Sequence, residues 1–195
     1  MKTIYFSELD QLPEAFLLKK NIGNQFLKHH IYTIKDAFFS IKNMPYGRNK
    51  KRDQYLDVFI NQQGTCTTKH SLLVALAIET NIKMTLFSGI YYLTAKNTPE
   101  ITSILTHYKL KEIPEAHCFI QYNDLYFDIT TKHAAACLDI VDIVQLDINA
   151  IYPKKDLFHK QFIEKWVQDQ HINYRPEDIW TIREECISAL STVFL

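Results

Sequence analysis

The first forty residues place apolar positions at intervals that predict helices. Ser7 followed by Asp10 is typical of a helix start, and we expect a first helix that runs to about Lys20 and ends at Asn21-Ile22-Gly23. Apolar residues then recur at helical spacing and predict a second helix from about Asn24 to Lys42. One buried stripe of this helix is formed by Phe26, Leu27, Ile31, Ile34, Phe38 and Ile41.

A break in the helical pattern follows. Met44-Pro45-Tyr46-Gly47 ends the second helix, and Arg48 to Arg52 forms a basic loop. Residues near Tyr55 to Ile60 are compatible with a short extended segment or a short helix. Such a basic run is most simply a solvated loop. The alternatives are a site for acidic partners or phosphate, or the rim of an active site, because the loop precedes the most informative segment of the chain.

That segment begins at Gly64-Thr65-Cys66 and continues as the almost uniformly apolar run Ser71 to Ile78. Gly64 supplies a free backbone turn, and Thr65 can cap a helix whose first turn contains Cys66. A helix that is apolar on nearly every side is buried all round. The pattern therefore predicts a buried helix with a cysteine at its N-terminus.

The second half of the chain carries strand patterns. Lys83 to Leu93 is rich in β-branched and aromatic residues and predicts a strand. Ala116 to Tyr122 and Leu125 to Thr130 predict two strands joined by the tight turn Asn123-Asp124. Leu138 to Ile148 alternates apolar and acidic residues, which predicts one further strand.

Three more helices complete the expected order of elements. Thr98-Pro99-Glu100 opens a short helix, residues 156–171 form another, and the last runs from Pro176 to the end. Helices, a buried helix, antiparallel strands and further helices make an α+β pattern. We expect residues 1–195 to form a single domain, with a core at about residues 43–150 and helical flanks at 1–42 and 151–195.

Composition excludes several classes of protein. Twenty-two acidic residues balance 22 basic ones, which does not favour binding to nucleic acid or to an anionic membrane. No apolar run is long enough to span a bilayer, and Glu8 interrupts the N-terminus before a secretory signal develops, so a cytoplasmic protein is expected. The four cysteines, Cys66, Cys118, Cys137 and Cys186, show no CxxC spacing and are expected to be reduced thiols.

Cys66 has the surroundings that a nucleophilic cysteine requires. The N–H groups at a helix N-terminus favour the thiolate and can also stabilise an oxyanion. A two-residue turn at Asn123-Asp124 sets Phe119 opposite Asp128 and therefore brings Asp128 diagonally across from His117 on one sheet face. The sequence thus predicts a nucleophile, a histidine base and an orienting carboxylate.

These residues resemble the transglutaminase-like superfamily, in which a G-x-C motif, a strand histidine and a D-x-T ending occur in this order. The matching segments are Gly64-Thr65-Cys66, Ala116-His117 and Asp128-Ile129-Thr130, and the resemblance covers roughly residues 60 to 130. It implies a papain-like fold in which Cys66 is the nucleophile, His117 the general base and acid, and Asp128 the orienting carboxylate. Members include proteases, amidases, deamidases, glycan-removing enzymes and acyltransferases, as well as domains thought to lack catalysis.

Two features depart from the superfamily pattern. Thr67 follows the nucleophile, where many relatives have an aromatic residue. The side chain that would stabilise an oxyanion is not identified by a motif, and the upstream candidates are Tyr46, Gln62 and Gln63. These departures bear on rate and substrate more than on fold.

The same residues allow other interpretations. His70 lies four residues after Cys66 on the same helix face and competes as the base, but no orienting carboxylate is evident, so we assign it a structural role. A zinc site would gather His117, Cys118, His133 and Cys137, yet neighbouring strand residues point to opposite faces and the spacing matches no usual zinc pattern. The cysteines other than Cys66 are most simply core or surface thiols. Trp166 and Trp180 are expected to be packing residues.

The resemblance implies a thiol-dependent amide or acyl hydrolase of the peptidase, amidase or deamidase type, acting through a thioester intermediate. Its substrate would be a peptide, a protein or a small amide, bound between loops such as residues 44–52 and 96–114, without metal or organic cofactor. The alternative is a catalytically silent binding or scaffold domain of the same superfamily. A third reading is a structural domain in which the three residues coincide by chance. The two C-terminal helices could also support a homo-oligomer.

Overall fold

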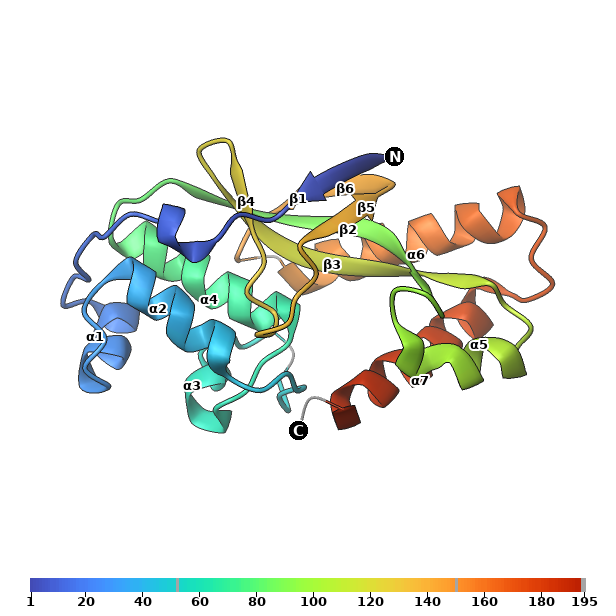
Figure 1. Ribbon diagram of the computed structural model, residues 1–195, viewed down its shortest axis with the longest axis horizontal. Coiled ribbons are helices and arrows are strands. Elements are labelled where there is room, and N and C mark those ends of the chain that lie inside the picture. Colours follow the sequence, from blue (N-terminus) through green and yellow to red (C-terminus); the bar gives the residue numbers. More distant parts are fainter. Residues whose placement is uncertain (52, 150, 194–195) are drawn as a thin grey trace.

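The protein is described by a computed structural model that covers residues 1–51, 53–149 and 151–193, with side chains described through residue 190. Over these residues it is a mixed α+β fold with two antiparallel sheets (Figure 1). The expected α+β class is therefore confirmed. The large sheet runs through the middle of the molecule, and helices cover its two ends.

The large sheet has the strand order β4-β3-β2-β6. Its centre is the pair β2 (Met84–Thr94) and β3 (Glu112–Tyr122), which are antiparallel over their full length from Met84↔Tyr122 to Thr94↔Glu112. β4 (Leu125–Phe127) continues β3 through the Asn123-Asp124 turn, and β6 (Asp142–Leu146) pairs with the other edge of β2. The long central pair gives the site a rigid support.

The small sheet is a correction to the expected elements. It pairs β1 (Lys2–Tyr5) with β5 (Cys137–Ile140), so the N-terminal flank contributes a strand as well as helices. The single strand expected over Leu138 to Ile148 is wrong, because Val141 separates β5 from β6 and the two strands join different sheets. Val141 donates its N–H to Ile90, which lets the chain cross from one sheet to the other.

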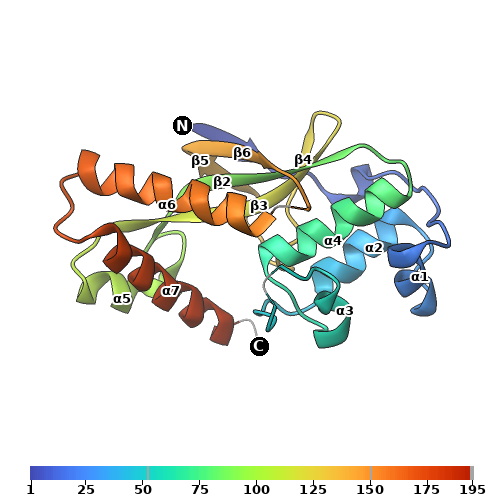
Figure 2. The same ribbon diagram turned by 180° about the vertical axis from the view of Figure 1, so that it is seen from behind.

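Helices at one end of the sheet pack around α4 (Cys66–Glu79), as Figures 1 and 2 show. They are α1 (Asn21–Lys28), α2 (Ile34–Asn43) and the short α3 (Asp57–Asn61), which settles the segment near residues 55–60 as helical. Phe26, Phe38, Leu72 and Leu76 are fully buried in this core. The expected buried helix with Cys66 in its first turn is confirmed.

The N-terminal helices begin and end where the sequence did not predict. The stretch between Ser7 and Lys20 holds only a 3₁₀ turn, η1 (Leu9–Gln11), and Asn21-Ile22-Gly23 begins α1 instead of ending a helix. The Glu79 carboxylate of α4 accepts hydrogen bonds from the N–H groups of Ile22 and Gly23, so a tertiary contact caps this helix. The expected helix over residues 24–42 is divided at His30, whose φ is 58°.

The other end of the sheet is covered by α5, α6 and α7 (Figures 1 and 2). A 3₁₀ turn, η2 (Pro99–Ile101), leads into α5 (Thr102–His107), while α6 (Ile151–Asp169) begins about one turn before the expected position. α7 (Pro176–Val193) was predicted correctly over the described residues. Trp166 is buried in a second core formed with Ile113 and Ile179. Among the described residues, no helix has the length and apolarity required to cross a membrane.

Candidate active site

Cys66 is the first residue of α4, and its position is fixed by a capping box. The Thr68 side chain accepts a hydrogen bond from the Thr65 N–H at 3.0 Å, and the Thr65 hydroxyl accepts one from the Thr68 N–H. Gly64 precedes the cap where no side chain fits. A Cβ there would lie 2.8 Å from Thr68 Oγ1 and 2.9 Å from Val58 Cγ2.

His117 and Asp128 are brought together by the β3–β4 hairpin. The predicted register is confirmed at Tyr122↔Leu125 and Ile120↔Phe127, but the ladder ends at Phe127, so the expected facing pairs of Asp128 and Thr130 are not formed. Asp128 instead turns its carboxylate inward, where Oδ1 accepts from the Thr130 N–H at 2.9 Å and the Thr130 hydroxyl at 2.6 Å. Its Oδ2 lies 2.9 Å from Nε2 of His117.

The charges of this group follow from its contacts. Burial would raise the pKa of Asp128, but the charge and hydrogen bond of His117 outweigh it and lower that pKa to about 2. Burial would likewise lower the pKa of His117, whereas the charge and hydrogen bond of Asp128, together with Cys66, raise it to about 10. His117 and Asp128 are therefore an ion pair at neutral pH.

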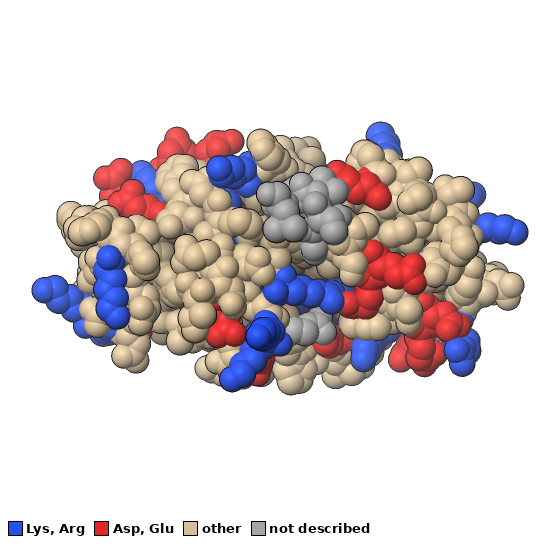
Figure 3. All heavy atoms as spheres, turned by 90° about the horizontal axis from the view of Figure 1, so that it is seen from below, with Lys and Arg blue, Asp and Glu red and all other residues tan. Residues whose placement is uncertain are grey.

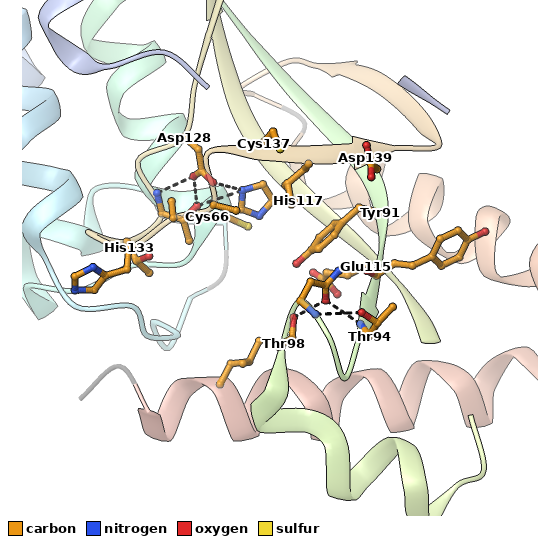
Figure 4. A pocket seen from close by; sticks show the side chains of 18 of the residues that line it. Cys66, Tyr91, Thr94, Thr98, Glu115, His117, Asp128, His133, Cys137 and Asp139 are labelled. Atoms are coloured by element: carbon orange, nitrogen blue, oxygen red, sulfur yellow. Dashed lines mark hydrogen bonds and ion pairs between the residues drawn. The ribbon is translucent and has the colours of Figure 1, made fainter. Parts of the chain in front are cut away.

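Cys66 lies next to this pair. Its sulfur is drawn beside the His117 ring in Figure 4, and both residues line the same cavity. A hydrogen bond from the Cys118 thiol, the charge of Lys155 and the bond and charge of His117 outweigh burial and hold the pKa of Cys66 well below its ordinary value. A thiolate, a histidine that can transfer protons and a carboxylate that orients the histidine are the three groups that nucleophilic catalysis by a cysteine uses.

His70 is engaged at both ring nitrogens. Nδ1 donates to the Cys66 carbonyl oxygen at 2.6 Å, and Nε2 accepts from the Ile129 N–H at 3.0 Å. Oδ1 of Asp128 lies 3.5 Å from Nε2 of His70. His70 therefore has a carboxylate neighbour that the sequence did not show. Burial nevertheless lowers the pKa of His70 to about 4, which keeps the ring neutral. Through these two hydrogen bonds, His70 connects the first turn of α4 to the segment that carries Asp128.

Lys69 makes a second connection of this kind. Its ammonium is fully buried and donates to the carbonyl oxygens of Met44 at 2.5 Å and Thr130 at 2.8 Å. Burial lowers the pKa of Lys69 to about 8. The side chain thereby ties α4 both to the loop that follows α2 and to the segment after β4.

A cavity of about 500 Å³ opens in front of Cys66, His117 and Asp128. Figure 4 looks into it and shows Tyr91 and Glu115 beyond His117, on the side of Thr94 and Thr98. Further lining residues come from both loops expected to form a pocket and from two segments that the sequence did not suggest: Tyr46, Asn97, Glu100, His133, Cys137, Asp139, Ile187 and Leu190. The cavity is large enough for a side chain and part of a backbone.

The three oxyanion candidates lie in different places. Tyr46 lines the cavity together with Cys66, and burial followed by the charge of Cys66 raises the pKa of its phenol. The amide of Gln62 donates to the Phe59 carbonyl oxygen at 2.6 Å, and that of Gln63 to the Arg48 carbonyl oxygen at 3.1 Å. Neither glutamine lines a cavity that contains Cys66, because each closes a local loop instead.

The residues of the zinc alternative do not assemble. In the part of the chain that the structure describes, no three His, Cys, Asp or Glu side chains are placed to hold a metal ion. His133 and Cys137 line the cavity, while Cys118 is buried behind it and bonds to the Thr67 hydroxyl at 3.7 Å. Cys186 is buried in the core and Cys137 is exposed, as expected for core and surface thiols.

A smaller cavity behind Cys66 contains residues that the sequence did not single out. Lys155 of α6 and the buried ion pair of Glu115 with Arg183 of α7 lie there. Arg48 of the basic loop also lines this smaller cavity and forms an ion pair with Glu184 at 2.6 Å. Arg52 of the same loop lies outside the described residues. Figure 3, which shows the molecule from below the view of Figure 1, has Lys and Arg side chains near the middle of that face, next to a group of Asp and Glu side chains.

The helical flank is thus part of the site, which only tertiary packing reveals. Lys155 follows another lysine in a polar stretch that is typical of a solvated helix face.

Comparison with known proteins adds no further assignment: no family model, no curated protein and no solved structure matches the chain.

Proposed function

We propose that this chain is a thiol-dependent amide or acyl hydrolase of transglutaminase-like, papain-like type. One observation carries the proposal: Nε2 of His117 lies 2.9 Å from the Asp128 carboxylate, and both residues line one cavity with the Cys66 thiol at a helix N-terminus. The antiparallel sheet packed against the helix that begins at Cys66 is compatible with this type of fold.

In the proposed reaction the Cys66 thiolate attacks an acyl carbonyl carbon and forms the new C–S bond. The imidazolium of His117 then gives its proton to the leaving nitrogen as the C–N bond breaks, which leaves a thioester on Cys66 and a neutral His117. His117 next takes a proton from water, and the hydroxide attacks the thioester carbonyl. Cleavage of the C–S bond releases the acid, and the thiolate–imidazolium pair is restored.

The oxyanion of this reaction requires donors close to Cys66. The first N–H groups of a helix have no intrahelical partner, so the Cys66 N–H at the start of α4 is one donor. The Tyr46 phenol, which lines the same cavity and remains protonated, is the side-chain donor that we assign. Gln62 and Gln63 are not assigned this role, because their amides are bound in local loops.

The proposal is tested with p-nitrophenyl acetate as a small activated acyl donor. We expect a burst of nitrophenol, acetylation of Cys66 that is visible by mass spectrometry after acid quench, and slow turnover. His117→Ala removes the base for deacylation, so the acetyl group should persist on Cys66 and turnover should fall by roughly 10²- to 10⁴-fold.

His29→Ala is the matched control, because His29 is an exposed histidine that does not line the cavity. It should turn over like the wild-type protein. Absence of acetylation at Cys66 in the wild-type protein, or equal deacylation in His117→Ala, would contradict the hydrolase proposal. Such a result would favour the catalytically silent binding domain.

A further inference from the structure

Lys155 is a buried ammonium that contacts the sulfur of Cys66. Its Nζ lies 3.8 Å from Sγ of Cys66 and 2.9 Å from the Thr67 hydroxyl, and the residue is 7% exposed. The side chain reaches the site from α6, on the side of the smaller cavity that also contains Cys66 and Tyr46. His117 approaches the same sulfur from the larger cavity.

The charge of Lys155 has no carboxylate partner. Across the described residues, no Asp or Glu oxygen lies within 4.0 Å of its Nζ, whereas two other buried cations of this region pair with carboxylates, His117 with Asp128 and Arg183 with Glu115. A buried ammonium needs a compensating anion or complete hydrogen bonding. The Cys66 sulfur is the anion that this arrangement provides.

Lys69 shows what a buried lysine does without such a partner. It donates to two neutral carbonyl oxygens, and burial lowers its pKa to about 8. Burial would also lower the pKa of Lys155, but the charges that Cys118, Cys66 and Glu115 carry when ionised outweigh it and raise that pKa above its ordinary value. Burial raises the pKa of Cys118 itself, so Cys66 and Glu115 are the anions of this group at neutral pH. Lys155 therefore stays an ammonium at neutral pH, and it does not act as an amine that accepts an acyl group.

We propose that Lys155 is a further catalytic residue of this site, the second cation that holds Cys66 as a thiolate. This inference rests on the proposed function, since it assigns Lys155 a part in activating the same nucleophile. Two cations beside one sulfur favour its thiolate form more strongly than His117 alone would. Nothing in the sequence motif requires a lysine from the C-terminal flank.

Several titratable groups surround the pair and enter any pH profile of Cys66. They come from α4, β3, the segment after β4, the loop after α2, α6 and α7, and they are His117, Cys118, Glu115, Asp128, Tyr46, Lys69, His70, Tyr152, Asp156, His159 and Arg183. Glu115 and Asp128 are compensated by Arg183 and His117, and His70 and His159 stay neutral because burial lowers the pKa of each to about 4. Lys155 is thus the charge whose removal changes Cys66 most directly from this side.

The test is the pH dependence of iodoacetamide alkylation at Cys66, followed by mass spectrometry of the Cys66 peptide. Lys155→Met removes the charge and nearly preserves the volume, and Lys154→Met is the matched control because Lys154 is the exposed neighbour on the same helix. We expect the alkylation midpoint to rise by on the order of one to three pH units in Lys155→Met alone.

The rate constants add a signature that a merely structural role would not produce. Thiolate nucleophilicity rises with thiol pKa, so for each unit of midpoint shift Lys155→Met should react about 3-fold more slowly below both midpoints and about 3-fold faster above both. The two pH–rate curves should therefore cross. Equal midpoints in Lys155→Met and Lys154→Met, or parallel curves without crossing, would overturn the inference.

Two further measurements decide the question if Lys155→Met does not fold. Lys155→Gln removes the charge but can still donate to the Thr67 hydroxyl, and the same rise in midpoint is expected. His117→Ala leaves Lys155 in place, so its Cys66 midpoint should stay below the ordinary thiol value of about 8.5. A midpoint at or above that value in His117→Ala, or an unchanged one in Lys155→Gln, would overturn the role of Lys155.

Alkylation requires no turnover, so the two proposals fail separately. In one outcome, p-nitrophenyl acetate is not hydrolysed but the alkylation midpoint of Cys66 still depends on Lys155. The hydrolase proposal and a catalytic role of Lys155 are then refuted, whereas the pairing of Lys155 with the Cys66 thiolate stands. If hydrolysis depends on His117 while Lys155→Met leaves the midpoint unchanged, the hydrolase proposal stands and the inference about Lys155 is wrong.

Discussion

Acid should destabilise this protein through His70, the buried histidine that joins the start of α4 to the segment carrying Asp128. In the folded protein its pKa is lowered to about 4 by burial, from an ordinary value of 6.5. The unfolded chain therefore binds a proton at His70 between these two values, while the folded protein does not. Stability falls as the pH falls from 6.5 to 4 and levels off below that range.

The magnitude follows from the size of this shift. Each pKa unit corresponds to about 1.4 kcal/mol, so a difference of 6.5 − 4 units makes the free energy of unfolding about 3 kcal/mol smaller at pH 4 than at neutral pH. His70 is completely buried, so solvent does not screen this contribution. Such a loss is a large part of the stability of an ordinary domain, about 5–15 kcal/mol.

The assay is urea denaturation of the wild-type protein and His70→Asn at several pH values between 4.5 and 7.5. At pH 7.5 the variant should be less stable by about 1–3 kcal/mol, because one of the two hydrogen bonds of His70 is lost. Its stability should depend less on pH, so the two curves approach each other toward pH 4.5. His133→Asn is the control, since His133 is exposed and makes no such bridge.

An equal pH dependence in the wild-type protein and His70→Asn would refute this reasoning. It would mean that His70 is protonated in the folded protein, or that the site opens before His70 titrates. Acid inactivation at the same pH as the loss of stability would connect the two events, because His70 holds Cys66 against the segment that carries Asp128.

Two further predictions concern the same site. Asp128→Asn removes the largest contribution to the raised pKa of His117, which is about 10, so the alkaline limb of amide hydrolysis should move from near pH 10 to lower pH. A limb that stays in place would contradict the assigned ion pair. Gly64→Ala places a Cβ 2.8 Å from Thr68 Oγ1 and 2.9 Å from Val58 Cγ2, so urea denaturation should show a loss of about 1–3 kcal/mol, and an unchanged unfolding midpoint would show that the cap tolerates a side chain.

Local patterns were sufficient where the determining contacts are close in sequence. Thr65 and Thr68 cap α4 from within the same turn, and the apolar run after them leaves a buried helix as the only way to remove those side chains from water. The Asn123-Asp124 turn likewise determines the register of β3 and β4. The helix that begins at Cys66 and the register that brings the strand of His117 against residues 125–127 could therefore be predicted from local patterns.

Patterns were insufficient where a distant contact decides the local structure. α1 begins at Asn21 because Glu79 of α4 binds its first N–H groups, a partner that no pattern near Asn21 contains. The segment after Phe127 leaves the ladder because Asp128 finds Thr130 and His117, and residues 137–146 divide between two sheets because β1 takes β5 as its partner.

The sequence by itself determined the helix that presents Cys66 and the hairpin that carries His117, since local hydrogen bonding and hydrophobic periodicity decide both. Only the tertiary structure decided what surrounds the sulfur. Lys155 of α6 lies 3.8 Å from it, and Tyr46 of the loop after α2 lines the same cavities as Cys66. Electrostatic interactions depend on distance in the fold and not on distance along the chain, so the environment of the thiol could not be read from its neighbours in sequence.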